Sequence, residues 1–125
     1  MSVKFFFLFT GLSGLVSVIM GAFGTHGLRG RIDESMLHAF ETGVTYQLSH
    51  TLALFGVCIL MQMWGTKTAL QFAGYGFTIG ILLFSGSLYA LALTGLKWFG
   101  PVTPIGGLAL IAGWAALTYA VWENA

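Results

Sequence analysis

Residues 44–64 read VTYQLSHTLALFGVCILMQMW, a run of 21 residues without an Asp, Glu, Lys or Arg. A helix needs about 20 mostly apolar residues to cross the ~30 Å hydrocarbon core of a bilayer. This run is long enough, and so are three others, at about residues 5–24, 69–94 and 104–122. Backbone groups in lipid must hydrogen-bond within their own segment, and these runs lack the alternation of barrel strands. Each run is therefore predicted to be a transmembrane helix.

The composition of the 125-residue chain agrees with a membrane location. Charged residues make up 7% of it and hydrophobic residues 57%, whereas soluble domains are about 25% charged. So few charges exclude a soluble monomer. The net charge of +1 also excludes a nucleic-acid partner, because binding to phosphates needs many Lys and Arg side chains. The 18 glycines indicate helices that pack closely in lipid.

The connections between these runs predict how the helices are arranged. Short links at 65–68 and 95–103 favour antiparallel hairpins. The expected fold class is therefore all-α, an integral membrane four-helix bundle in a single membrane domain, residues 1–125. The predicted helices are about 5–24, 35–64 (with 44–64 spanning), 69–94 and 104–122. The first is expected to be retained rather than cleaved as a secretory signal, because its apolar run exceeds the usual 7–15 residues.

The link between the first two helices is different from the others. It holds five of the nine charged residues: Arg29, Arg31, Asp33, Glu34 and Glu41. Asp33 is a candidate helix cap. A helix over 35–64 would be about 45 Å long at 1.5 Å per residue, which exceeds the hydrocarbon thickness. Its first ten residues are therefore predicted to lie at the membrane interface or to form a separate surface helix.

Four crossings place both termini on one side of the membrane, called side A. The first and third links then lie on the opposite side B. Side B has three basic residues against two on side A, which favours side B as cytoplasmic. At the start of the fourth helix, Thr103 is the expected cap and Pro104 the expected first helical residue.

Small residues recur at four-residue spacing on three of the helices. Such stripes let helices approach closely in lipid, and they are expected to mediate packing. Because there are more of them than one bundle requires, self-association or a larger membrane protein complex is also expected, in addition to contacts with membrane lipids. The stripes are Ser13, Ser17 and Gly21; Gly76 and Gly80; and Ala112, Ala116 and Ala120.

Polar side chains gather in the side-B half of the predicted bundle. On the second helix, His38, Glu41, Thr45 and Ser49 fall within an arc of about 80°, which is expected to face protein rather than lipid. Glu41 or His50 is expected to contact the N-terminal end of the fourth helix, whose dipole favours a negative group. The candidate ligand-binding or structural cluster is His26, Glu41, Tyr46, His50, Ser87, Tyr89, Thr103 and Pro104.

Three interpretations of this cluster remain open. The cluster can join the helices through polar contacts, bind a small ligand, lipid or proton, or hold a metal or haem. The His38-x-x-Glu41 pair is a candidate for metal ligation, and two of the three histidines could ligate haem. The third and fourth helices offer no His, Asp or Glu within the membrane, which argues against a di-metal carboxylate site. Neither a metal nor another cofactor is predicted. Nucleophile-elbow, phosphate-loop and zinc-protease motifs are absent from the sequence, so no enzyme activity is predicted.

Seven short motifs in this order resemble domain-of-unknown-function family 423. These are small bacterial inner-membrane proteins similar to eukaryotic transmembrane protein 256. The resemblance implies a four-helix protein of the bacterial inner (plasma) membrane and assigns no catalytic residue. All eight residues of the candidate cluster lie in these motifs, and His38 lies outside them. The motifs are GAFGTHGL (21–28), ETGVTYQ (41–47), HTLAL (50–54), FSGSLY (84–89), LTG (93–95), TPIGG (103–107) and GW (113–114).

These observations predict a non-enzymatic accessory or structural subunit of a membrane assembly. The alternative is a membrane protein that binds a small ligand, lipid or proton in the polar pocket on side B.

Overall fold

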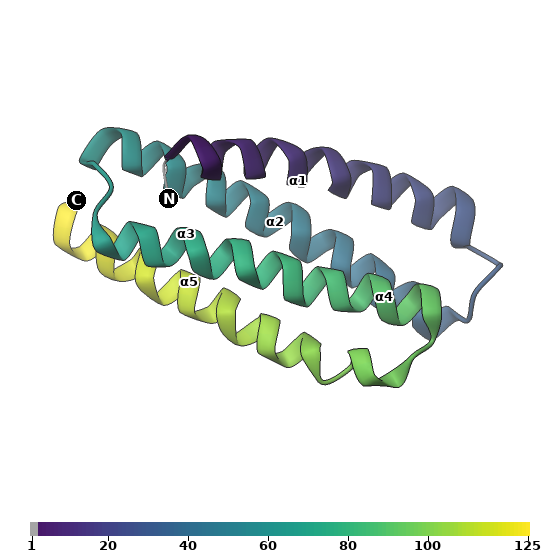
Figure 1. Ribbon diagram of the computed structural model, residues 1–125. Coiled ribbons are helices and arrows are strands. Elements are labelled where there is room, and N and C mark those ends of the chain that lie inside the picture. The colour runs from purple at the N-terminus through teal and green to yellow at the C-terminus, as the bar shows by residue number, and fades with distance from the viewer. Residues whose placement is uncertain (1–2) are drawn as a thin grey trace.

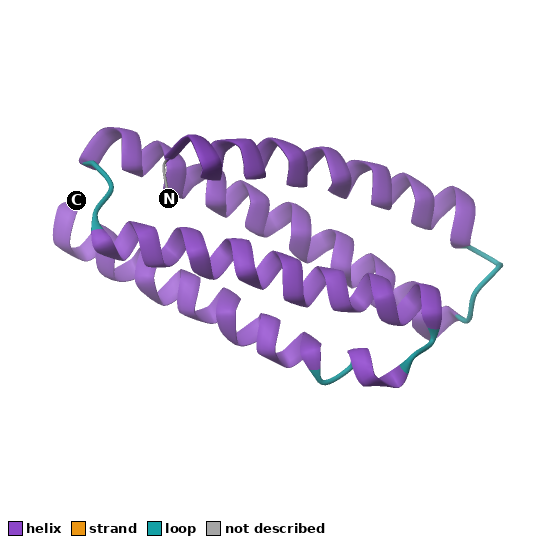
Figure 2. Ribbon diagram, in the orientation of Figure 1, coloured by secondary structure: helices purple, strands orange, loops and turns teal. Residues whose placement is uncertain are grey.

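The computed structural model describes residues 3–125, which form four helical spans packed side by side (Figure 1). Each span is long and apolar enough to cross a membrane: Val3–Leu28, Glu34–Trp64, Thr68–Thr94 and Lys97–Asn124. Within the described residues there is no strand, and short loops join the helices (Figure 2). The two ends of the chain lie at one end of the bundle (Figure 1). The predicted all-α membrane fold with antiparallel hairpins is confirmed.

Two of the spans contain a π-helical turn. The first span is α1 (Val3–Phe23) followed by the π-turn η1 (Gly24–Leu28), and the second is α2 (Glu34–Trp64). The third comprises α3 (Thr68–Gly80), the π-turn η2 (Ile81–Ser85) and α4 (Gly86–Thr94). The fourth comprises the 3₁₀ turn η3 (Lys97–Phe99) and α5 (Val102–Asn124). Gly95 ends α4 at φ 72°, a left-handed conformation that glycine adopts without steric cost.

The structure decides between the two alternatives for the start of α2 and corrects the expected start of the fourth helix. The helix α2 is continuous from Glu34, so no separate surface helix forms in the link. Its 31 residues span about 46 Å, so its first turns extend beyond the hydrocarbon. At the fourth helix, Pro101 takes the cap position. Thr103 and Pro104 lie inside the first turn of α5, and the Thr103 hydroxyl bonds to another helix instead of capping its own.

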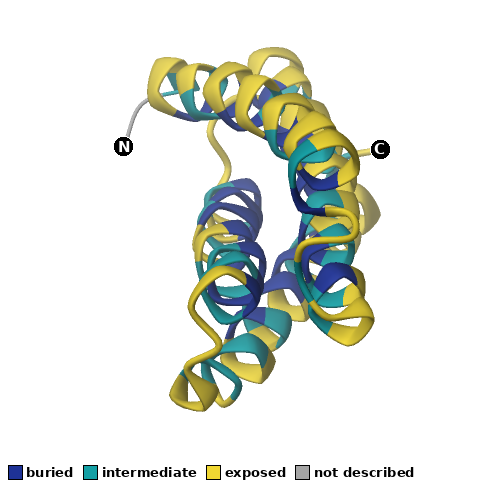
Figure 3. Cartoon of the chain, turned by 90° about the vertical axis from the view of Figure 1, so that its right-hand side faces the viewer, coloured by how far each residue is buried: buried dark blue, intermediate teal, exposed yellow. Residues whose placement is uncertain are grey.

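The helices do not form a closed ring. The order across the bundle is α1, α2, the α3–η2–α4 span and α5. In residues 3–125, α1 packs on α2, touches α3 briefly and does not approach α5. Buried residues lie where the helices face one another, and exposed residues cover the outer surfaces (Figure 3). One side of α1 therefore has no neighbouring helix.

Glycines allow α3 and η2 to pack closely against α5. A Cβ on Gly76 would lie 2.8 Å from the Gly113 Cα, and a Cβ on Gly106 only 2.3 Å from the Phe84 backbone nitrogen. Neither position can accept a side chain unless the helices move apart. The predicted packing role of Gly76 and Gly80 is thus confirmed. We call this contact, made by Gly76, Gly80, Gly106 and Gly113, the glycine seam.

The prediction that the alanine stripe of α5 forms one packing face is wrong. Ala120 is fully buried, Ala116 is half-buried and Ala112 is exposed. The glycine seam has rotated α5 so that the side with Ala112 points away from the core. On α1, the stripe is buried at Ser13 and Ser17 and half-buried at Gly21.

Candidate functional site: polar pairs between the helices

The predicted side-B cluster is divided among several separate contacts. Figure 1 places the α1–α2 and α4–α5 links together at the end of the bundle opposite the termini, which is side B. His26 is exposed in η1 there and contacts none of the other candidates through a hydrogen bond within residues 3–125. Pro104 is also exposed. The remaining candidates belong to four contacts, each of which joins a different pair or set of elements.

The most extensive contact centres on Gln47 of α2. Its Oε1 accepts a hydrogen bond from the Tyr89 hydroxyl of α4 at 2.6 Å. Its Nε2 donates to the Ser13 carbonyl and hydroxyl oxygens of α1, both at 3.2 Å. Ser13 and Thr51 share a further hydrogen bond of 2.7 Å between their hydroxyls. We call Ser13, Gln47, Thr51 and Tyr89 the Gln47 network; it joins α1, α2 and α4.

His50 joins α2 to α5. The Trp114 Nε1 donates to the His50 Nε2 at 3.0 Å. Because an indole nitrogen can only donate, Nε2 must be the unprotonated ring nitrogen. Nδ1 therefore carries the proton and donates to the Tyr46 backbone carbonyl at 2.9 Å. His50 is a neutral imidazole with both nitrogens occupied, and the Tyr46 ring stacks on it with centroids 5.6 Å apart.

These bonds bear on the proposed metal and haem ligands. The Nε2 of His50 cannot ligate a metal while it accepts the Trp114 hydrogen bond. His38 lies exposed on the first turns of α2, away from the His50–Trp114 pair. In residues 3–125, no group of three His, Cys, Asp or Glu side chains is placed to hold a metal ion.

Glu41 is held at the surface. Its Oε2 accepts a hydrogen bond from the Arg29 Nη2 at 3.3 Å, and the two side chains are 46% and 55% exposed. The expectation that Glu41 or His50 meets the N-terminal end of the fourth helix is therefore wrong. Ser87 of α4 reaches that end instead, and its buried hydroxyl shares a 2.5 Å hydrogen bond with the Thr103 hydroxyl.

The prediction that the polar arc of α2 faces protein is also wrong. His38, Thr45 and Ser49 are exposed. The Ser49 hydroxyl donates to the Thr45 carbonyl, and such i−4 bonds satisfy a helical hydroxyl without help from another helix. The side chain can then face lipid. The buried face of α2 instead presents Gln47 and His50.

Ser85, in the π-turn η2, makes a contact that the candidate list missed. Its hydroxyl donates to the Gly43 carbonyl of α2 at 2.7 Å. A Cβ on Gly43 would lie 2.9 Å from the Tyr89 ring, so this glycine lets the third span approach α2. The sequence signal for Ser85 is its place in the FSGSLY motif; Thr51 likewise lies in the HTLAL motif, and Ser13 lies in the small-residue stripe of the first helix.

Two cavities lie beside these contacts. One of about 330 Å³ lies between α1 and the third span and is bordered by Ser13, Gln47 and Tyr89. The other, of about 440 Å³, is bordered by His50, Phe84 and Trp114. Most of the lining of both cavities is apolar, and the Gln47–Tyr89 and His50–Trp114 pairs that border them are already hydrogen-bonded.

Residues 20–107 match the model of a family described as "Protein of unknown function (DUF423)". The chain belongs to this family. The matched part of the DUF423 sequence contains Gln47, His50, Tyr89 and the Ser87–Thr103 pair, whereas Ser13 and Trp114 lie outside it.

Curated relatives of this DUF423 member are membrane proteins by name. The chain is 40% identical to the UPF0382 membrane protein SAB0533 of Staphylococcus aureus, over 98% of this chain and 99% of that protein. It is 39% identical to the UPF0382 membrane protein YwdK of Bacillus subtilis, over 94% and 96%. It is 38% identical to the UPF0382 inner membrane protein YgdD of Escherichia coli, over 94% and 88%. No solved structure matches the chain.

These relatives and the four apolar spans together identify an integral protein of the bacterial inner (plasma) membrane.

Proposed function

We propose that this DUF423 protein is a non-enzymatic accessory or structural subunit of a membrane assembly. The observation that supports this proposal is the pairing of polar groups between the helices. Tyr89 binds Gln47, Trp114 binds His50, and Ser87 binds Thr103. Within the described residues, Thr78 Oγ1 is the single buried side-chain polar atom without a partner. Pairs that satisfy buried polar groups between helices are what a structural role requires.

The unpartnered side of α1 is the surface that would bind another subunit. Leu8, Leu12, Leu15 and Ile19 are all more than half exposed, and their spacing places them on one face of the helix. Gly11 lies between them, and a Cβ there would meet nothing within 4 Å. A small residue among large ones allows a second transmembrane helix to approach closely.

A substitution at Gly11 tests this proposal. We expect the tagged protein, extracted from its native membrane in a mild detergent, to run in size-exclusion chromatography with light scattering as a complex of fixed stoichiometry. Gly11→Trp should dissociate that complex, because the indole would occupy the docking face. Gly56→Trp is the matched control, since Gly56 is also helical, exposed and free of neighbours within 4 Å. A wild-type protein that runs as a monomer, or equal loss in both variants, would contradict the proposal.

A second candidate function is binding of a small ligand or lipid in the side-B half. The 330 Å³ cavity beside the Gln47 network favours it, because an apolar space with Gln47 and Tyr89 at its edge is typical of a ligand pocket. This function predicts a mass adduct on the purified protein that Leu82→Trp, which fills the cavity lining, removes. The subunit function predicts no such dependence.

A further inference from the structure

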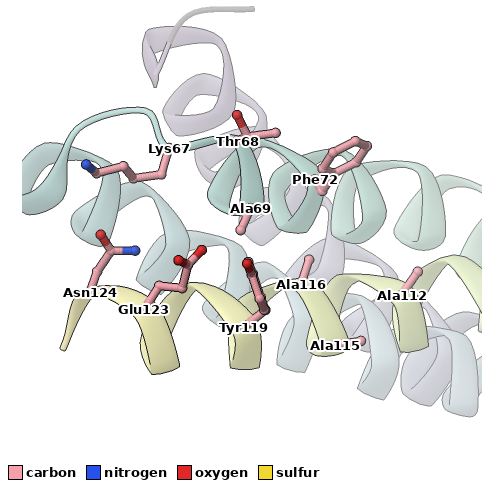
Figure 4. A pocket seen from close by; sticks show the side chains of 10 residues that line it. All are labelled: Lys67, Thr68, Ala69, Phe72, Ala112, Ala115, Ala116, Tyr119, Glu123 and Asn124. Carbon is pink, nitrogen blue, oxygen red and sulfur yellow. The ribbon is translucent and has the colours of Figure 1, made fainter.

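A large groove lies at side A, away from the polar pairs. It is a groove of about 850 Å³ between the beginning of α3 and the end of α5. The α5 wall has Ala112, Ala115, Ala116, Tyr119 and Glu123, whose spacing places them on one face of the helix. Figure 4 shows Phe72 of α3 above these alanines, whereas Lys67 and Asn124 lie at one end of the groove.

The length of the groove matches one leaflet of a bilayer. Eleven residues separate Ala112 from Glu123, which is about 16 Å along the helix axis at 1.5 Å per residue. Half of the ~30 Å hydrocarbon core is about 15 Å. The charged end lies near the end of α5, where the exposed Trp122 marks the membrane interface. The groove therefore extends from the headgroup region to about the bilayer midplane, as an acyl chain does.

The mouth of the groove has one charge of each sign. Lys67 and Glu123 both line it, yet they do not pair with each other. The one ion pair within 4 Å in residues 3–125 joins Arg29 to Glu41. Lys67 also holds the cap position of α3, where no side chain caps the first turn. The positive end of the helix dipole therefore adds to the attraction of Lys67 for an anion.

We propose that this groove binds one phosphatidylethanolamine molecule. The lipid phosphate lies against Lys67 and the first turn of α3, and the primary ammonium lies against the Glu123 carboxylate. One acyl chain follows the alanines of α5 toward the midplane. An anionic lipid without an ammonium would leave the negative charge of Glu123 without a partner. A choline headgroup has no N–H to donate to that carboxylate, so it would lose the charge-assisted hydrogen bond.

Native mass spectrometry of the delipidated full-length protein tests this proposal. The probes are phosphatidylethanolamine, phosphatidylglycerol and phosphatidylcholine with identical acyl chains. We expect phosphatidylethanolamine to bind best. Lys67→Gln and Glu123→Gln should each weaken its binding by about tenfold, the loss expected for one charge-assisted contact. Lys97→Gln, a charge change at side B, should leave binding unchanged.

A second pair of variants tests the acyl-chain path without changing any charge. Ala112→Phe should fill the groove and reduce phosphatidylethanolamine binding. Ile111→Phe is the matched control, because Ile111 is exposed on the same helix and does not line this groove.

Three outcomes would overturn the proposal. Equal binding of the three lipids, unaffected by every variant, would mean that lipids coat the surface without selection. Preference for phosphatidylglycerol, unchanged by Glu123→Gln, would mean that the groove binds any anionic lipid. Conversion of a dimer to a monomer by Ala112→Phe, without a change in lipid binding, would mean that a second copy of the chain fills the groove.

Discussion

Trp114 on α5 and His50 on α2 are joined by a hydrogen bond of 3.0 Å between the indole Nε1 and the imidazole Nε2. The helices α2 and α5 otherwise have little contact, because the third span lies between them. This bond and the Tyr46 carbonyl together hold the imidazole in the Nδ1–H tautomer. Within residues 3–125 the Trp114–His50 bond is the one side-chain hydrogen bond between α2 and α5.

Removing the indole donor should therefore destabilise the protein. Trp114→Phe keeps an aromatic ring against Phe77 but leaves the His50 Nε2 without a donor. We expect the free energy of unfolding to fall by about 1–3 kcal/mol, the range for an unsatisfied buried polar group. The measurement is SDS-induced unfolding in mixed micelles, followed by far-UV circular dichroism. The control is Trp122→Phe, since Trp122 is 85% exposed; equal losses in both variants would contradict the role of this bond.

The Gln47 network makes a parallel prediction for Tyr89. Tyr89→Phe removes the hydroxyl that donates to the Gln47 Oε1 and leaves that buried oxygen unpaired. The same unfolding measurement should show a loss of about 1–3 kcal/mol. Tyr46→Phe serves as the comparison, because the Tyr46 hydroxyl has no hydrogen-bond partner within residues 3–125 and the residue is exposed. If the two variants unfold alike, Tyr89 does not hold the network together.

Packing at the glycine seam can be tested with a single methyl group. In Gly106→Ala the new Cβ would lie 2.3 Å from the Phe84 backbone nitrogen, so α5 must shift. We expect a loss of about 3 kcal/mol, near the upper end for overpacking. Gly86→Ala adds the same methyl group to a helix position with nothing within 4 Å, and it should be neutral or slightly stabilising. An unchanged Gly106→Ala protein would mean that the seam is looser than described.

Glu41 should matter much less for stability. Its ion pair with Arg29 is about half exposed on both sides, and exposed pairs contribute about 1 kcal/mol or less. Glu41→Gln should therefore lower the free energy of unfolding by less than about 1 kcal/mol, and this difference should shrink as salt is added. A double-mutant cycle with Arg29→Gln measures the pair directly. A coupling well above this value would show that the link is a rigid part of the fold.

The spans could be predicted from the sequence because the requirement is physical and local: about 20 apolar residues to cross the bilayer. The hairpins follow from the short links on either side of the third span. Whether a side chain faces lipid or another helix depends on residues far away in the sequence. Ser49 is polar yet exposed, because its hydroxyl bonds to its own helix, whereas Gln47 and His50 have partners on other helices.

The pairing of His50 with Trp114 could not be predicted, because it depends on how the glycine seam rotates α5. The π-turn η2 adds a further difficulty. Its wider turn changes the angular spacing of side chains, so a regular helical wheel drawn from α3 misplaces the faces of α4. No feature of the sequence distinguished Ile81–Ser85 from ordinary helix. The position of Ser87 in the side-B polar cluster is predictable from the sequence, but the separate partners of Ser85 and Ser87, Gly43 and Thr103, follow only from the fold.

The bond between Gln47 and Tyr89 also has a consequence for biogenesis. The two residues are 42 positions apart, so the ribosome completes the α1–α2 hairpin long before α4 exists. During that interval the Gln47 amide can bond to Ser13, but its carbonyl oxygen lacks its final donor. The newly made hairpin therefore enters the membrane with the Gln47 Oε1 unpaired. Insertion of α4 then supplies the Tyr89 hydroxyl as its donor.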